Sequence, residues 1–175
     1  MCIEIDECIF DAKEVPFLGF IVTGTGLRMD PDKAKAIVDW PRPTTVTEVQ
    51  QTLGLGNFYR RFIPSYAAIM APITDLLRGK TKNIIWKESQ EAACLKIVIS
   101  FTSGKTPILR HYDPNRPALV ETDASDFAIA GILSQKCEDG KLRPISFISR
   151  KFSQAELNYD VFDTEMLAIF FSLQK

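Results

Sequence analysis

The hydrophobic and polar positions of this chain change their period along its length, and the first segment has the pattern of strands. The run from Val15 to Val22 is rich in strand-forming residues. The Thr-Gly-Thr-Gly sequence at 23–26 supplies the permissive backbone of a tight reversal before Leu27 to Met29. These features predict a β-hairpin. Asp30 and Pro31 then provide the oxygen-bearing cap and first-turn proline that begin a helix.

Helical spacing dominates the next part of the chain. Thr45 and Glu48 have the spacing of a capping box. We expect the helix that they begin to break at the Gly-Leu-Gly sequence 54–56, where glycines would let another backbone approach closely. An apolar stripe from Ile69 to Leu77 predicts another helix, and a further one is expected from about Glu88 to Phe101. The apolar residues that share one face of this last helix are Ala92, Leu95 and Ile99.

The pattern changes to strands near Pro107. The proline-rich segment from His111 to Pro117 reads as a connection, so we place a domain boundary there, with one domain at 1–110 and a second at 111–175. The second domain is expected to contain an antiparallel meander and a C-terminal amphipathic helix. Its predicted strands are Ala118 to Thr122, Phe127 to Gln135 and Arg143 to Ser149, with a turn at 138–140. The fold class is therefore mixed, α+β or α/β.

Composition and charge restrict the function only weakly. The chain has 21 basic and 22 acidic residues, so any attraction to nucleic acid has to come from local clusters. Its cysteines and its single histidine lack the spacing of a structural zinc site; they are Cys2, Cys8, Cys94, Cys137 and His111. The N-terminus lacks the layout of a secretory signal, and no apolar run is long enough to span a bilayer. We therefore expect a soluble intracellular protein that is not secreted and has no membrane partner.

Five stretches, in order along the chain, resemble the polymerases of gypsy-type long-terminal-repeat retrotransposons. The first resembles the Phe-Leu-Gly turn of these enzymes, the second and third the segment that enters the thumb and the thumb itself, and the last two the start of a ribonuclease H domain. They are Val15 to Phe20, Asp30 to Lys33 with Ile37 to Pro43, Leu53 to Ile63, Thr122 to Asp126, and Asn158 to Ile169. Phe20 departs from the family, which usually has histidine there.

The resemblance implies a hairpin and helical thumb-like region, followed by a ribonuclease H-like fold cut short after three strands and one helix. It also implies that the chain contacts a primer–template and an RNA:DNA hybrid as part of a longer Pol polyprotein, in cytoplasmic virus-like particles or in the nucleus. The nucleic-acid-binding residues that it implies are Phe17, Leu18, Gly19, Asn57, Tyr59, Arg60 and Arg61. The pattern alone favours a different interpretation of the aromatic and basic cluster at 58–61, namely a solvated basic turn in which at least one aromatic residue enters the core and the arginines face solvent.

Ribonuclease H cleaves a phosphodiester with two Mg²⁺ ions, which take carboxylate oxygens as ligands. The resemblance assigns Asp123 and Glu165 to this catalytic and metal-binding set. Without the resemblance, Asp123 reads as a turn or cap residue and Glu165 as a solvated helix charge. The later acidic ligands of the family do not appear before Lys175.

Because two carboxylates cannot fix a metal pair, we expect the isolated chain to be inactive in hydrolysis. The polymerase carboxylates are likewise not found before Val15. Two alternatives to an enzyme fragment remain at this point. The chain is then a non-catalytic module that binds nucleic acid or protein, or a decayed transposon relic.

Overall fold

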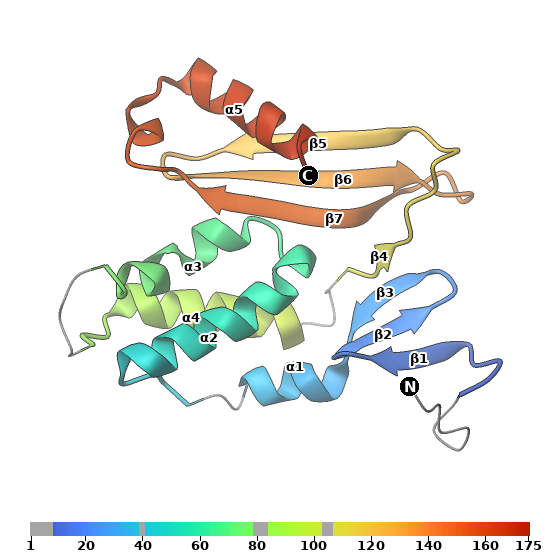
Figure 1. Cartoon of the computed structure of the whole chain (residues 1–175), viewed down its shortest axis with the longest axis horizontal. Coiled ribbons are helices and arrows are strands. Elements are labelled where there is room, and N and C mark those ends of the chain that lie inside the picture. Colours follow the sequence, from blue (N-terminus) through green and yellow to red (C-terminus); the bar gives the residue numbers. More distant parts are fainter. Residues whose placement is uncertain (1–8, 39–40, 79–83, 103–106) are drawn as a thin grey trace, which may run out of the picture.

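The computed structural model describes residues 9–38, 41–78, 84–102 and 107–175, and it contains two antiparallel sheets with helices beside and between them (Figure 1). The first sheet has the order β1-β2-β3-β4 and the second the order β5-β6-β7. The strands are β1 Glu14–Phe17, β2 Phe20–Thr23, β3 Gly26–Met29, β4 Leu109–Arg110, β5 Ala118–Ala124, β6 Ala128–Lys136 and β7 Leu142–Lys151. The helices are α1 Pro31–Val38, α2 Val46–Tyr59, α3 Tyr66–Asp75, α4 Glu88–Thr102 and α5 Val161–Leu173, with short 3₁₀ turns η2 Arg60–Phe62 and η3 Glu156–Asn158.

The N-terminal hairpin is confirmed, but the run expected as one strand forms two. Leu18 and Gly19 have φ values of 48° and 80°, so the chain reverses between β1 and β2. It reverses again after Thr23, whose hydroxyl accepts a hydrogen bond from the Gly26 N–H at 3.1 Å. The strand pattern was therefore right, and the first turn within it is the Phe-Leu-Gly turn that the family resemblance implied.

The capping box that begins α2 is confirmed, whereas the break expected at 54–56 is wrong. The Thr45 hydroxyl accepts from the Glu48 N–H, and the Glu48 carboxylate accepts from the Thr45 N–H. The helix then continues to Tyr59 through both glycines. A Cβ on Gly56 would lie 2.4 Å from the Tyr66 hydroxyl oxygen, so this glycine makes room for a side chain and not for another backbone.

The helix α4 has the expected extent, but the face that packs is not the one formed by Ala92, Leu95 and Ile99. Leu95 and Ile99 are 58% and 52% exposed. The buried residues of α4 are instead Gln90, Ala93, Ile97 and Phe101. The Gln90 side chain donates to the Pro72 carbonyl at 3.0 Å, which ties α4 to α3.

The predicted meander and C-terminal helix are confirmed, and the three-stranded sheet lies between helices. α5 covers one face over β5 and β6, while α3 and η2 pack against β7 on the other side (Figure 1). Phe147 of β7 belongs to the same apolar cluster as Phe62 and Ile73 of the helical part. A smaller cluster beneath α5 joins Ile129, Phe152 and Ala168.

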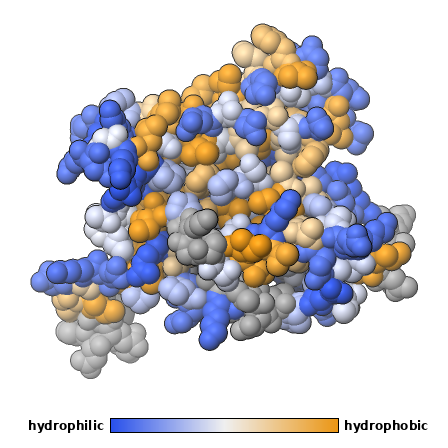
Figure 2. All heavy atoms as spheres, turned by 180° about the vertical axis from the view of Figure 1, so that it is seen from behind, coloured by the Kyte–Doolittle hydropathy of each residue, from blue (hydrophilic) through white to orange (hydrophobic). Residues whose placement is uncertain are grey.

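The outer face of α5 carries exposed apolar side chains, seen at the top of the molecule in Figure 2. They are Val161, Phe162, Met166, Ile169, Phe170 and Leu173. Among the described residues, no helix combines the length and the apolar character that crossing a bilayer requires.

Candidate nucleic-acid interface

The turn between β1 and β2 presents two apolar side chains to solvent. Phe17 is 60% exposed and Leu18 is 72% exposed. Leu18 and Gly19 both have left-handed backbone conformations, which fit the twist of a two-residue hairpin turn. Because these two apolar side chains are not buried within the protein, they are available to contact a partner.

The same turn is fixed to the C-terminal end of α2. The Tyr59 hydroxyl donates a hydrogen bond to the Gly19 carbonyl oxygen at 3.2 Å. The Asp30 N–H donates to this oxygen as well, at 3.3 Å. The structure thus brings together two of the predicted nucleic-acid-binding residues, Gly19 and Tyr59, which lie far apart in sequence.

Tyr59 itself is not placed to touch nucleic acid. Only 2% of its surface is exposed, and its ring packs edge-on against Phe20, Phe58 and Phe101. Burial, and then the nearby Asp30 carboxylate, raise the pKa of the Tyr59 hydroxyl. The prediction of a direct contact at Tyr59 is corrected to a place beneath the turn, and this agrees with the expectation that one aromatic residue of the cluster enters the core.

The neighbouring Phe58 belongs to the predicted aromatic and basic cluster at 58–61 but was not among the residues predicted to bind nucleic acid. Its ring is 47% exposed and stacks on Phe20 with centroids 4.8 Å apart. Phe20 also stacks on Phe62 at 5.5 Å. Phe20, which departs from the family pattern, was the one sign in the sequence of this arrangement. Its aromatic ring lies between those of Phe58 and Phe62, and the three rings form a continuous stack.

The polar residues predicted to bind nucleic acid at 57–61, which are Asn57, Arg60 and Arg61, are all exposed. Asn57 and Arg60 line a hollow of about 250 Å³ together with Ser149 and Arg150 of β7. Arg60 and Arg61 form no ion pair with another described residue. Their guanidinium groups are therefore free to bind an anion.

The cations of β7 beside this hollow are instead paired within the protein. Arg150 makes two hydrogen bonds to the Glu156 carboxylate, at 2.7 and 2.9 Å, and these bonds are the main reason that the pKa of Glu156 falls to about 2. Lys151 pairs with Asp75 at 2.8 Å. The unpaired positive charge of this region thus lies on η2 and not on β7.

Asp123 lies near the end of β5, and its side chain is exposed. Cross-strand partners share a face of an antiparallel sheet, and Gly131, the partner of Thr122, faces Ser172 of α5. Because successive strand residues alternate between faces, Asp123 lies on the face away from α5.

Glu165 is half-buried on α5, one turn before Ala168. Ala168 packs with Ile129 and with Ala124, the residue that follows Asp123 in β5. Glu165 therefore lies near the same end of the sheet as Asp123. The two carboxylates thus lie on opposite sides of β5, which is an edge strand of this sheet. A shared ion would lie at that edge, and this shared ion stays a prediction.

The carboxylates suit Mg²⁺ in chemistry but not in number. Hard divalent cations bind oxygen ligands, and a two-ion site needs more than two carboxylates. Within the described ranges, no group of three or more His, Cys, Asp or Glu side chains is arranged to hold a metal ion. Asp123 and Glu165 are therefore not by themselves a metal centre.

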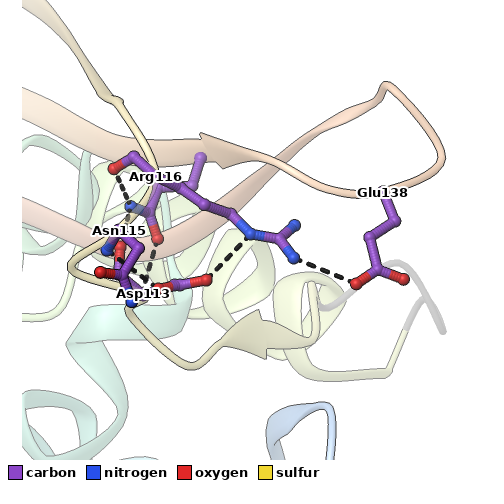
Figure 3. Close-up of polar contacts among 5 residues, drawn as sticks. Asp113, Asn115, Arg116 and Glu138 are labelled. Carbon is purple, nitrogen blue, oxygen red and sulfur yellow. Dashed lines mark hydrogen bonds and ion pairs between the residues drawn. The ribbon is translucent and has the colours of Figure 1, made fainter.

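The connection after β4 carries a polar network that sequence reasoning did not identify. Arg116 pairs with Asp113 at 2.9 Å and with Glu138 at 3.1 Å (Figure 3). The buried Gln135 side chain donates to the Asp113 and Arg116 carbonyls and accepts from the Asp113 N–H. These bonds fasten the connection to β6, so their role is structural.

The chain is similar in sequence to known proteins. Residues 86–175 match the family described as "RNase H-like domain found in reverse transcriptase". The chain belongs to this family. It is 41% identical over 167 residues to the retrovirus-related Pol polyprotein from transposon 297 of Drosophila melanogaster, covering 95% of this chain and 15% of the relative. It is 37% identical over 170 residues to the transposon Tf2-3 polyprotein of Schizosaccharomyces pombe, covering 96% of this chain and 12% of the relative.

Solved structures agree with the family. The foamy viral protease-reverse transcriptase in complex with dsDNA superposes with a TM-score of 0.79 at 27% identity, covering 94% of this chain and 34% of that one. The same protein in complex with RNA/DNA hybrid gives 0.77 at 28% identity, covering 93% and 22%. The fold class and the retrotransposon resemblance are confirmed. This RNase H-like family member spans less than a sixth of the polyproteins to which it is similar, and the domain boundary at 110/111 stays a prediction.

Proposed function

We propose that this chain is the part of a retrotransposon reverse transcriptase that holds the primer–template and begins the nuclease domain. In the complete Pol polyprotein it would serve RNA-directed DNA synthesis and hydrolysis of RNA in RNA:DNA hybrids, in virus-like particles or in the nucleus. The observation that carries this proposal is the exposed turn at 17–19, anchored to the end of α2. Directly after that helix come Arg60 and Arg61, which form no ion pair within the described part of the chain. The related foamy viral enzyme binds dsDNA and RNA/DNA hybrid.

Local charge supports nucleic-acid binding where the net charge does not. The chain has 21 basic and 22 acidic residues, so its overall field does not attract a polyanion. Unpaired arginines can instead contact phosphates and release counterions, which makes binding sensitive to salt. Asn57 beside Arg60 adds a hydrogen-bonding group in the same hollow.

In the proposed nuclease, Asp123 and Glu165 would contribute ligands to Mg²⁺. The ion supplies activation of the attacking water and stabilisation of the leaving oxygen. Asp123 and Glu165 alone would supply two carboxylates, too few to hold two Mg²⁺ ions. We therefore propose that the isolated chain binds hybrid duplex without cleaving it.

Fluorescence anisotropy with a labelled RNA:DNA hybrid tests the binding. The double variant Arg60→Ala/Arg61→Ala is expected to weaken binding about tenfold or more and to reduce the salt slope by about 2. The matched control is Arg42→Ala/Arg78→Ala, which removes two arginines that are paired with Glu91 and Asp75. Equal losses from both double variants, or no binding by the unaltered chain, would exclude the proposed interface.

Incubation of the chain with hybrid and Mg²⁺ tests the second part of the proposal. No cleavage is expected. Cleavage that disappears in Asp123→Asn, but persists in the control Asp126→Asn three residues away, would contradict the proposed inactivity of the isolated chain. Asp126 is also exposed, so the control changes one carboxylate of similar setting.

A further inference from the structure

The turn between β1 and β2 has a conformation that its own sequence does not favour. Leu18 has a φ of 48°, where the Cβ of an L-residue crowds the following carbonyl. Strained residues of this kind persist only where surrounding contacts hold them. The contacts of the next two residues, Gly19 and Phe20, supply that support.

Two different kinds of contact hold the turn in place. The Gly19 carbonyl accepts hydrogen bonds from the Tyr59 hydroxyl at 3.2 Å and from the Asp30 N–H at 3.3 Å. The Phe20 ring stacks on both Phe58 and Phe62, with interplanar angles of 20° in each case. The ring stack fixes the strand, and the Tyr59 hydroxyl fixes the turn itself.

The fit between the turn and Tyr59 is close. A Cβ on Gly19 would lie 2.8 Å from the Tyr59 hydroxyl oxygen, so a larger residue does not fit there. A tyrosine hydroxyl has an ordinary pKa of about 10 and donates a hydrogen bond near neutral pH. Burial, and then Asp30, raise the pKa of Tyr59 further. On the other side of the turn, Phe17 and Leu18 face solvent.

We propose that Tyr59 is a positioning residue whose hydroxyl holds the turn at 17–19 against the end of α2, so that Leu18 meets the bound duplex in a fixed place. This inference rests on the proposed function. Tyr59 acts from beneath the turn and makes no contact with nucleic acid. The partner of the turn is a primer–template duplex, whose sugars and base edges accept apolar contacts.

A merely structural role for Tyr59 can be separated from positioning with a matched pair of variants. Tyr59→Phe keeps the ring and its aromatic neighbours and removes only the hydrogen bond. Tyr66→Phe is the control, because Tyr66 is also buried and its hydroxyl has no hydrogen-bond partner among the described residues. Both variants lose one oxygen from the same region.

Hydrogen exchange of the 175-residue chain without nucleic acid tests the anchoring. Tyr59→Phe is expected to speed exchange in the peptide covering 15–22 by about threefold to tenfold, the range of one net hydrogen bond. Tyr66→Phe is expected to leave that peptide unchanged. Unchanged exchange in Tyr59→Phe would overturn the proposal. Because no duplex is present, this result does not depend on the proposed function.

Anisotropy with a DNA primer–template duplex tests the consequence. Tyr59→Phe is expected to weaken binding about threefold to tenfold. Leu18→Asn, which removes the apolar side chain but tolerates the left-handed backbone, is expected to weaken binding too. If Tyr59 acts through the turn, the double variant binds no more weakly than Leu18→Asn. The proposal would be overturned if the binding losses of Tyr59→Phe and Leu18→Asn were fully additive in the double variant. It would also be overturned if Tyr59→Phe bound as well as the unaltered chain. Failure of the unaltered chain to bind counts against the proposed function and leaves the exchange result as the test of anchoring.

Discussion

Gly56 shows how one hydrogen atom in place of a side chain allows two helices to meet. A Cβ at this position would lie 2.4 Å from the Tyr66 hydroxyl oxygen and 3.3 Å from its ring. Tyr66 is 5% exposed and has little room to move aside. We expect Gly56→Ala to destabilise the fold by about 1–3 kcal/mol through overpacking, as measured by urea unfolding.

The control for this substitution lies two residues earlier in the same helix. No atom of the described residues would lie within 4 Å of a Cβ on Gly54, so Gly54→Ala should stabilise α2 by up to about 1 kcal/mol. Combining Gly56→Ala with Tyr66→Phe should recover part of the loss. Equal effects of the two alanines would show that backbone freedom, and not the Tyr66 contact, decides the residue at 56.

The Arg150–Glu156 pair predicts a dependence of stability on pH. The two hydrogen bonds from Arg150, followed by one from the Ser153 N–H, lower the pKa of Glu156 from 4.5 to about 2. A carboxyl with a lowered folded pKa stabilises the protein above its unfolded pKa, and the stabilisation disappears as pH falls from about 4.5 to about 2. Glu156→Gln should therefore cost on the order of 1–3 kcal/mol at pH 7 and much less near pH 2.

Thermal unfolding of the unaltered protein and of Glu156→Gln, from pH 7 to pH 2, measures the difference in their stability. Glu138→Gln is the control, because the Glu138 side chain is 90% exposed and makes one contact with Arg116. It should change stability little at any pH. A Glu156→Gln deficit that stays constant from pH 7 to pH 2 would contradict this account.

At the scale of single elements, the start of α2 depends on its cap. Thr45 accepts a hydrogen bond from the Glu48 N–H at 3.2 Å, and the Glu48 carboxylate binds the backbone before the helix. Thr45→Ala should destabilise the protein by about 1 kcal/mol. Thr47→Ala makes the same change inside the first turn, where alanine is the better helix former, and should be neutral or stabilising. Circular dichroism during urea unfolding compares the two.

At the scale of the whole molecule, the second sheet completes the helical part. Ser65, which precedes α3, makes no side-chain cap hydrogen bond. The cap is supplied from β7, where the Ser149 hydroxyl accepts from the Ala67 N–H at 2.9 Å. Ser149→Ala would leave this N–H unpaired and should destabilise the protein by about 1–3 kcal/mol.

Hydrogen exchange locates the effect of Ser149→Ala. Exchange should speed up in both α3 and β7, because the lost bond joins them. Ser146→Ala on the same strand is the control, since its hydroxyl has only a long contact of 3.5 Å with the Phe147 carbonyl. A change confined to β7 would show that the sheet and the helices unfold separately.

Patterns read along the chain were enough to predict most of the local elements and the family. The strand-forming runs and the turn at 138–140 predicted the meander of β5, β6 and β7, and the Thr45 capping box predicted where α2 begins. These features depend on neighbours within a few positions, so they can be read along the chain. The collinear motifs indicated the retrotransposon polymerase that the family match confirms.

Which of those residues face solvent and which lie beneath them depends on how the elements pack. Tyr59 and Phe58 are adjacent in sequence, yet one is buried under the turn at 17–19 and the other is exposed. The buried face of α4 likewise depends on its packing with α3, where the Gln90 side chain donates to the Pro72 carbonyl. The physical reason is that burial depends on how side-chain volumes fit between elements, and no local pattern contains that fit.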